Sequence, residues 1–305
     1  MNYSRAYFKH QVFFLSLVLL ACCLPFSHSF SNFQVFLTLI LFFGLGVPHG
    51  ALDLSIGKKL IQPKFGSRWS VIFVLVYVLC VMLVVVCWLQ FPLPSFIFFL
   101  GISAFHFGFS DRLNFKGFVG FLEAIARGFL PIGIPAYFYP QVFQSLIESS
   151  LSESQAHILL KILNFFFYPQ LIFVAVVILY GFYRKDKSNL MNSLELIFLL
   201  VLFLTLKPFA AFLIYFCFLH SIRHILNVLL EMNRHFNWNS VRWLIMESMP
   251  ATLVTLLALA ICYLALKREA IDVATMFNLF FISLSALTLP HMILVEAVKR
   301  CDLKS

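Results

Sequence analysis

The sequence predicts an all-α protein, a polytopic transmembrane helical bundle of about ten spans with both termini in the cytoplasm. Composition is the first observation, because 62% of the 305 residues are hydrophobic and only 11% are charged, against about 45–50% apolar and about 25% charged in soluble domains. The other two observations are a series of apolar runs and the placement of basic residues between them. A soluble globular protein is excluded, and we expect one integral-membrane domain over residues 1–305.

Apolar runs recur along the whole chain when it is read with a window of about 19 residues. They lie at 11–24, 33–48, 71–89, 93–109, 117–139, 165–183, 194–206, 208–230, 250–266 and 276–297. A spanning helix needs about 20 residues, so the shortest runs leave the count at about ten, give or take two, with a re-entrant segment as the alternative for one of them. We interpret the polar stretch 141–164 as an outer loop with an amphipathic segment.

The basic residues alternate between rich and poor loops, as the positive-inside rule requires. With the N-terminus inside, the inner segments hold most of the 22 Lys and Arg residues, whereas Lys267 and Arg268 fit poorly because they should face outward. The net charge of +9 is therefore attributed to topology. Nucleic acid is not an expected partner, because no basic stripe is interleaved with stacking aromatic residues.

The N-terminal region allows two interpretations. We expect residues 1–30 to add an N-terminal span, although the charged start and the sequence Leu19-Leu20-Ala21-Cys22 loosely resemble a lipoprotein signal with its cleavage box. The seven cysteines are odd in number and contain no Cys-x-x-Cys pattern. Neither a disulfide framework nor a zinc knuckle is therefore predicted.

Histidines at lipid depth are the main functional signal, because ionisable groups inside a membrane are costly and usually functional. Five of the nine histidines lie in or at the end of apolar runs, namely His49, His106, His220, His224 and His291. We assign the others to loops or interfaces as solvated side chains, namely His10, His28, His157 and His235. At 1.5 Å per residue the first five lie roughly 18–24 Å from the outer ends of their helices, which places them in one layer.

The spacing of His220 and His224 indicates a metal site. Residues four apart share one helix face, so the two rings could hold one ion from adjacent turns. No Glu lies between them, which excludes the His-Glu-x-x-His protease mechanism. Imidazole suits Fe, Cu, Zn and Ni, and an iron ion with only histidine ligands keeps positions open for O2. A b-type haem with two axial histidines is the alternative.

Charged residues near the histidines are candidates to orient the rings. They are Asp53, four residues after His49, Asp111, five after His106, and Glu296, five after His291. Asp53 shares a face with its histidine only if the helix continues through Pro48. Glu123 and Arg127 are spaced for an ion pair that either ties helices together or acts near the site, and Arg223 needs an acidic or carbonyl partner inside the bundle.

Three motifs occur in a fixed order along the chain: Pro48-His49-Gly50-Ala51-Leu52-Asp53, His106-Phe107-Gly108 with Asp111, and His220-Ser221-Ile222-Arg223-His224. Together they resemble the Brp/Blh family of membrane β-carotene 15,15′-dioxygenases from bacteria and archaea. The resemblance covers about residues 35–297, nearly the whole chain. It departs at Phe109-Ser110-Asp111, where many relatives are expected to be more acidic, and the first span looks like an N-terminal addition.

The resemblance implies an iron(II) enzyme that uses O2 to split the central double bond of β-carotene into two retinal molecules. The expected iron ligands are His49, His106, His220 and His224. Further expected site residues are His291, as a fifth ligand or a group beside the ligands, together with Asp53 and Arg223.

The resemblance also implies a multi-pass protein of the inner (cytoplasmic) membrane, with β-carotene and O2 as substrates and a retinal-accepting rhodopsin as a candidate partner. Two other classes remain as alternatives. A diiron desaturase or hydroxylase needs several histidine boxes, and only one occurs here. A haem- or proton-handling membrane protein would be separated by metal stoichiometry and an optical spectrum. No Lys lies mid-span, which disfavours a retinal-binding pump.

Overall fold

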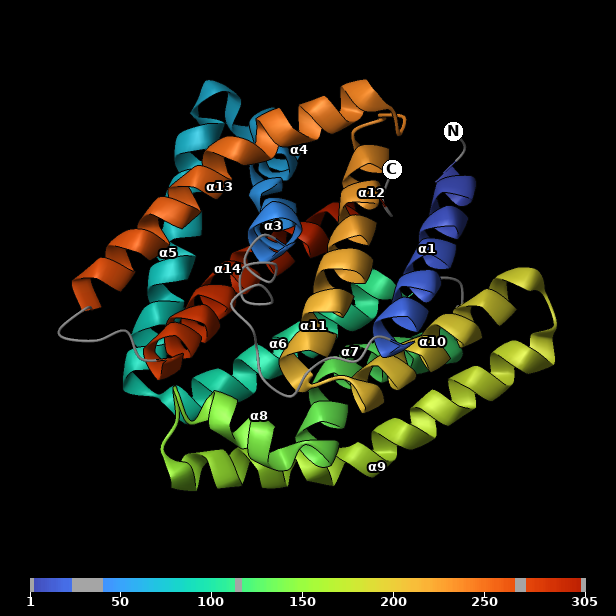
Figure 1. Cartoon of the computed structure of the whole chain (residues 1–305). Helices are drawn as coiled ribbons and strands as arrows, with labels where there is room; N and C mark the ends of the chain where they lie inside the picture. Colours follow the sequence, from blue (N-terminus) through green and yellow to red (C-terminus); the bar gives the residue numbers. More distant parts are fainter. Residues whose placement is uncertain (1–2, 24–40, 113–116, 267–272, 303–305) are drawn as a thin grey trace.

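The computed structural model describes residues 3–23, 41–112, 117–266 and 273–302 (Figure 1). In these ranges helix follows helix and no strand occurs, so the all-α prediction is confirmed. In chain order the elements are α1 (Tyr3–Cys23), η1 (Phe42–Gly46), α3 (Val47–Ala51), α4 (Asp53–Phe65), η2 (Gly66–Arg68), α5 (Trp69–Gln90), α6 (Pro92–Asp111), α7 (Gly117–Phe138), α8 (Pro140–Ile147), α9 (Glu153–Arg184), α10 (Lys187–Thr205), α11 (Pro208–Ile214), η3 (Tyr215–Ser221), α12 (Ile222–Glu231), α13 (Trp238–Leu266) and α14 (Val273–Asp302).

Within the described ranges, 9 helical segments are long and apolar enough to cross a membrane. They are Ala6–Cys23, Gly44–Gln90, Pro92–Asp111, Gly117–Phe138, Glu153–Arg184, Lys187–Thr205, Pro208–Glu231, Trp238–Cys262 and Phe277–Val298. The predicted run 33–48 lies partly outside the described residues. The prediction of a polytopic transmembrane bundle of about ten spans is confirmed by helix length and composition.

The outer surface of the bundle is suited to lipid, as α5 shows. Only Phe73, Val84 and Trp88 of this helix are buried. Its remaining surface exposes a row of large apolar side chains, namely Val71, Val74, Leu75, Val78, Leu79, Met82, Leu83, Val86 and Leu89. Soluble monomers rarely expose a continuous apolar patch of this kind, so this surface is suited to contact with hydrocarbon.

The prediction of an outer loop over 141–164 is wrong for its second half. Helix α8 ends at Ile147, and α9 begins at Glu153 with Ser152 as its N-cap. The Ser152 side chain accepts a hydrogen bond from the Gln155 backbone N–H, and the Gln155 side chain accepts one from the Ser152 backbone N–H. This reciprocal cap satisfies two backbone donors and extends the helix well before the apolar run begins.

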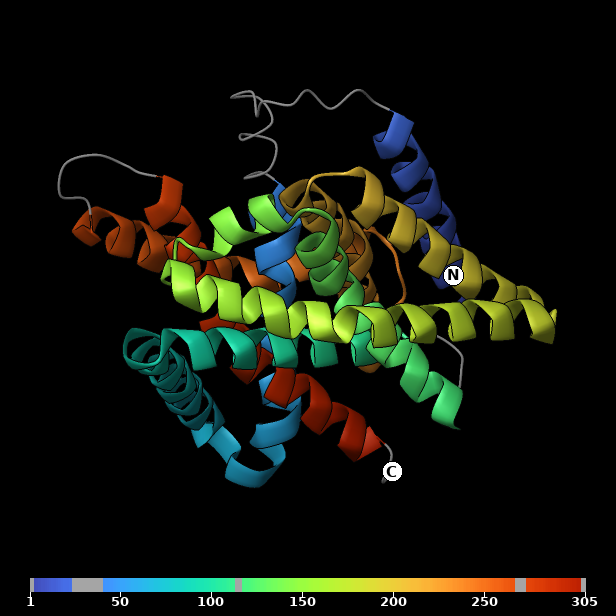
Figure 2. The same cartoon turned by 90° about the horizontal axis from the view of Figure 1, so that it is seen from below.

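Helix α7 packs against both α6 and α9 (Figure 2). A side chain at Gly108 of α6 would collide with the backbone carbonyl of Ala124, and one at Gly128 of α7 would collide with that of Ala104. Small residues let membrane helices approach closely. The two glycines therefore hold α6 directly against α7.

Two π-helical turns lie beside histidines. The turn η1 ends at Gly46, shortly before Pro48 and His49. Because proline has no N–H, the carbonyl four residues before it loses its helical partner and the backbone must adjust there. The second turn, η3, contains His220. Such turns are uncommon overall and occur frequently at functional sites; here one lies just before His49 and the other contains His220.

Candidate metal centre

Five helical segments bring the five lipid-depth histidines together in the interior. His49 lies on α3, His106 on α6, His220 on η3, His224 on α12 and His291 on α14. All five are buried, and none is more than 8% exposed. The five rings therefore lie together in the interior, as the prediction of one histidine layer from helix rise requires.

The ring centroids form a closed cage. His49 lies 5.5 Å from His220, 5.5 Å from His224 and 5.2 Å from His291. His106 completes the cage from the opposite side, 5.0 Å from both His220 and His291. His224 and His291 are 4.9 Å apart. Each ring thus has at least two other imidazoles as neighbours.

The spacing of the rings suits one shared metal ion. A metal–nitrogen distance of about 2.1 Å places each ring centroid about 3.2 Å from the ion, and two ligands at 90–110° are then about 4.5–5.3 Å apart. The observed separations of 4.9–5.5 Å overlap this range. No three His, Cys, Asp or Glu side chains of the described residues are, however, already arranged to hold an ion as they stand. The rings would therefore have to move before three of them could hold one ion.

Hydrogen bonds on the Nδ1 side fix several rings. Nδ1 of His220 donates to the Asp111 carboxylate at 3.2 Å, and Nδ1 of His291 donates to the Asp53 carboxylate at 2.6 Å. Nδ1 of His49 donates to the backbone carbonyl of Gly46. Because carbonyl and carboxylate oxygens only accept, the proton of each neutral ring sits on Nδ1 and leaves the Nε2 lone pair available.

Several ring nitrogens of the cage are buried without a hydrogen-bond partner. Nε2 of His220, Nε2 of His291 and both nitrogens of His106 are buried and make no hydrogen bond. A buried polar atom with no partner costs free energy unless something else satisfies it. Metal-ligating histidines usually donate their other ring N–H to a carboxylate or carbonyl, which is the pattern of His220 and His291.

The structure corrects three predicted partners, those of His49, His106 and His291. Helix α3 runs through Pro48-His49-Gly50 as the prediction required, but it ends at Ala51 and α4 begins at Asp53. Nδ1 of His49 donates to the Gly46 carbonyl, so Asp53 is not its partner. The Asp53 carboxylate instead contacts His291 and accepts a hydrogen bond from Tyr77 at 3.0 Å.

Asp111 likewise does not reach His106. Five residues turn a helix by about 140° beyond a full turn, which directs the carboxylate to another neighbour. That neighbour is His220, and Tyr215 donates a second hydrogen bond to the same carboxylate at 2.7 Å. His291 does not use Glu296, because its Nδ1 bonds to Asp53 and its Nε2 has no hydrogen-bond partner.

Arg223 has both an acidic partner and a carbonyl partner, the two kinds that were expected for a buried arginine. Its Nη1 donates to the backbone carbonyl of Asp111 at 2.6 Å, and its Nη2 donates to the Glu195 carboxylate at 2.8 Å. Glu195 also accepts from Arg127 at 2.5 Å, and Arg127 pairs with Glu123 at 2.8 Å. The Glu123–Arg127 pair lies within α7, and the Arg127–Glu195 contact ties α7 to α10. Through Glu195 and Arg223 this buried ionic network reaches the backbone carbonyl of Asp111.

Sequence reasoning missed two residues of this network, Glu195 and Gln11, and the burial of a third residue, His10. Glu195 is fully buried on α10, and its position inside an apolar run was the available signal. Gln11 of α1 donates to Glu195 at 3.1 Å. His10 was assigned to a solvated loop, which is wrong, because it is 7% exposed and its Nε2 donates to the Phe218 carbonyl of η3 at 2.7 Å. Helix α1 thus packs directly behind the histidine cage.

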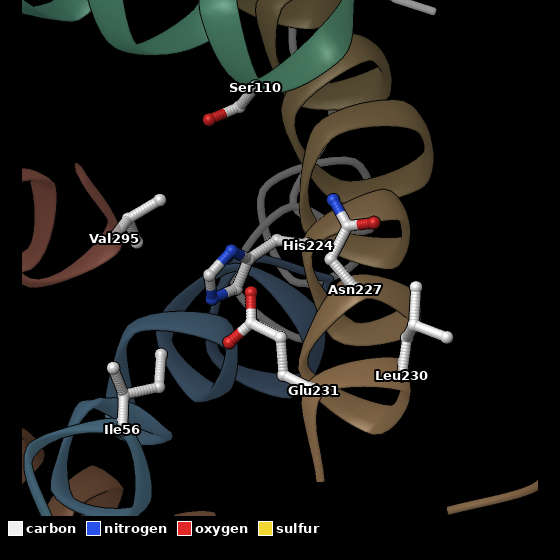
Figure 3. A pocket seen from close by; sticks show the side chains of 7 residues that line it. All are labelled: Ile56, Ser110, His224, Asn227, Leu230, Glu231 and Val295. Carbon is white, nitrogen blue, oxygen red and sulfur yellow. The ribbon is translucent and has the colours of Figure 1, made fainter. Parts of the chain in front are cut away.

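A cavity of about 260 Å³ adjoins the cage beside His224 (Figure 3). It is lined by Ile56, Ser110, His224, Asn227, Leu230, Glu231 and Val295. A second cavity, of about 620 Å³, lies between α1, α6, α10 and α12, and its lining includes Arg112, Lys187 and Arg223. The two cavities share Ser110 and Asn227.

A family model and two relatives of this chain carry the same description. A family model described as "Beta-carotene 15,15'-dioxygenase" matches residues 39–299. The "Beta-carotene 15,15'-dioxygenase" of an uncultured marine bacterium, 66A03, is 29% identical over 267 residues, which cover 87% of this chain and 93% of the relative. The "Probable beta-carotene 15,15'-dioxygenase Blh" of Halobacterium salinarum is 21% identical over 280 residues, 84% of this chain and 81% of the relative.

No solved structure matches the chain. The family model covers the segments that carry all five histidines of the cage and leaves the whole of α1 outside. The resemblance identified from the three sequence motifs is confirmed. The chain belongs to the β-carotene 15,15′-dioxygenase family.

Proposed function

We propose that this chain is an iron(II)-dependent β-carotene 15,15′-dioxygenase that cleaves the central double bond of β-carotene with O2 and forms two retinal molecules. Family membership supports the reaction, and the histidine cage supports the metal. The single observation that carries the proposal is the closed set of five buried imidazoles, with Nδ1 of three of them held and Nε2 of two of these left without a partner.

His49, His106, His220 and His224 would hold the iron, and we include His291 as a fifth donor. His291 is as close to the other rings as they are to one another, at 4.9–5.2 Å. Asp53 fixes its Nδ1 in the same way that Asp111 fixes Nδ1 of His220. An all-imidazole donor set suits iron.

When bound, iron supplies the redox chemistry that allows O2 to react with a carbon–carbon double bond. The reaction balances without another reductant, because one C=C bond breaks and each new carbonyl takes one oxygen atom of O2. The residues of the chain hold and orient the site. Asp53 and Asp111 keep protons on the outer ring nitrogens, and Arg223 positions the backbone of Asp111.

The surroundings of the cage suit an apolar substrate. Phe107 lies 4.8 Å from His220, and Phe216 lies 5.2 Å from His49, measured between ring centroids. Such walls exclude water from a site that handles O2. A polyene dissolved in the bilayer would reach a helical bundle from the side, and retinal would return to the lipid, where a rhodopsin could accept it. We expect the inner membrane of the cell as its location.

A haem-binding protein is less compatible with this geometry. Two axial histidines stand on opposite sides of a haem iron, which separates their ring centroids by about 6.4 Å with the macrocycle between them. The rings here lie 4.9–5.5 Å apart and meet edge to face. The cage leaves no room for a porphyrin between such pairs.

Expression in bacteria that accumulate β-carotene tests the proposed function. Retinal and shorter apocarotenals are quantified by chromatography beside a His220→Ala variant and a His157→Ala variant, whose ring is exposed and far along the sequence from the motifs. We expect loss of β-carotene with retinal formation in the wild type and in His157→Ala only. Unchanged β-carotene in folded, iron-loaded protein would contradict the proposal.

A further inference from the structure

The cavity beside His224 lies at the end of a polar stripe on one helix. His220, His224, Asn227 and Glu231 follow one another at spacings of four, three and four residues. These spacings place all four on one face of η3 and α12. Figure 3 shows the His224 ring and the Glu231 carboxylate directed into the same space, with the Ser110 hydroxyl opposite.

Exposure rises along this stripe. His220 is 1% and His224 is 5% exposed, whereas Asn227 and Glu231 are partly exposed. The stripe therefore runs from the interior of the cage to the end of α12 at the bundle surface. The beginning of α1 lies at this same end (Figure 1), which the distribution of basic residues predicts to be cytoplasmic.

The cavity does not suit the polyene. Its volume of about 260 Å³ is below the 300–1,000 Å³ of typical pockets for drug-sized ligands, and a carotenoid with forty carbon atoms is larger still. Four of its lining groups are polar, namely Ser110, His224, Asn227 and Glu231. Polar side chains in a membrane helix usually line a path for water or ions.

The two cavities differ in the charged groups that line them. Arg112 and Lys187 line the larger cavity, where their cationic groups lie over Phe109 and Phe8. Cations there repel a divalent metal ion. The smaller cavity carries the Glu231 carboxylate, has one cation, Lys59, beside its opening, and ends at an imidazole. Oxygen ligands followed by a nitrogen ligand suit stepwise exchange of the water molecules around an iron(II) ion.

We propose that this smaller cavity is the loading route by which hydrated iron(II) reaches the histidine cage, with Glu231 as the first group to contact the ion and His224 as the group that receives it. The Ser110 hydroxyl, which makes no hydrogen bond, provides an oxygen contact between them, whereas the Asn227 side-chain oxygen accepts from the Tyr7 hydroxyl. The inference rests on the proposed metal centre and adds a site to it.

Metal uptake by protein stripped with a chelator tests the route without measuring turnover. Cobalt(II) serves as an optical probe and iron(II) is added under anaerobic conditions, and the rate of uptake is followed by stopped flow together with final metal content per chain. Removing a charge at a steering site slows encounter by about tenfold or more at low salt. We expect that loss of rate in Glu231→Gln, with an unchanged final metal content.

Three further variants make the test specific. Leu230→Trp, at an exposed position on the cavity wall, should slow uptake by narrowing the route without removing charge. Lys59→Gln should speed uptake, because Lys59 donates to the Glu231 backbone carbonyl at 3.4 Å and places a cation beside the opening. Glu153→Gln, an exposed carboxylate at the start of α9, should leave the rate unchanged.

The outcomes separate this inference from the proposed function. If wild-type protein takes up no metal, or His220→Ala takes up as much as the wild type, the metal centre itself is wrong. If the wild type loads while Glu231→Gln and Leu230→Trp load at the same rate as the wild type, the route is wrong. If Glu231→Gln loads at the normal rate but to a lower final content, Glu231 affects affinity and the route is also wrong.

Discussion

Replacing Asp111 by asparagine removes one negative charge from the side of the cage that orients His220. The carboxylate accepts hydrogen bonds from Nδ1 of His220 at 3.2 Å and from the Tyr215 hydroxyl at 2.7 Å. Asparagine keeps the shape but offers one neutral oxygen and an NH2 donor in place of two charged oxygens, so Nδ1 of His220 and the Tyr215 hydroxyl would have to share one weaker acceptor. The hydrogen bond that fixes the tautomer of the ring would be weakened.

The expected magnitude follows from comparable groups beside metal-bound histidines, whose removal costs about 10–100-fold in metal affinity or activity. That range corresponds to about 1.4–2.8 kcal/mol of binding free energy. We therefore expect Asp111→Asn to weaken metal binding by that factor and to slow retinal formation similarly. The backbone carbonyl of Asp111 still accepts from Arg223, so the fold should persist.

Competition with a chelator of known affinity measures the metal dissociation constant of each variant. Tyr215→Phe is the matched control, because it removes one hydrogen bond to the carboxylate and leaves the contact with His220. Its effect should be clearly smaller than that of Asp111→Asn. If Asp111→Asn binds metal as tightly as the wild type and cleaves β-carotene at the same rate, the assignment of His220 as an oriented ligand is refuted.

Three other substitutions test separate parts of the structure. Gln11→Leu removes a buried hydrogen bond to a carboxylate, worth about 1.5–3 kcal/mol, and should lower the thermal unfolding temperature in detergent. The control Ser16→Ala, on the exposed face of α1, should leave that temperature unchanged. Equal unfolding temperatures for the two variants would show that α1 does not support the site. His291→Ala should reduce retained iron and retinal yield together, and full iron content in that variant would leave this histidine outside the ligand set. Gly128→Val forces a side chain into the backbone of α6 and should lower the free energy of unfolding by about 3 kcal/mol or more. The control Gly101→Ala, which has open space around it, should express and unfold like the wild type. Normal stability of Gly128→Val would contradict the close packing of α6 and α7.

The helices and the depth of the histidines could be predicted because both depend on local sequence. Apolar runs report which segments face lipid, and helix rise converts residue counts into depth. His49, His106, His220, His224 and His291 were therefore placed in one layer before their rings were seen together. Where local signals conflict, as in the polar start of α9, the helix extends further than hydropathy indicates.

The partners of the site residues could not be predicted, because they lie on different helices. Asp53 and His291 are 238 residues apart in the chain, and Asp111 and His220 are 109 apart. Spacing along one helix suggested that each carboxylate pairs with the histidine nearest to it in sequence. The packing of the helices instead places a different histidine beside each carboxylate. Glu195 was missed for the same reason, since its importance follows from two arginines on other helices.

The most direct test of the account measures the rate of retinal formation from β-carotene against the amount of iron bound per chain, using purified protein that is stripped of metal and then reloaded in steps. We predict that activity is absent without iron, rises in proportion to bound iron and reaches its limit at about one ion per chain, as a single histidine cage requires. Retinal formation that does not depend on bound iron, or that persists in His220→Ala, would contradict a histidine-held iron centre.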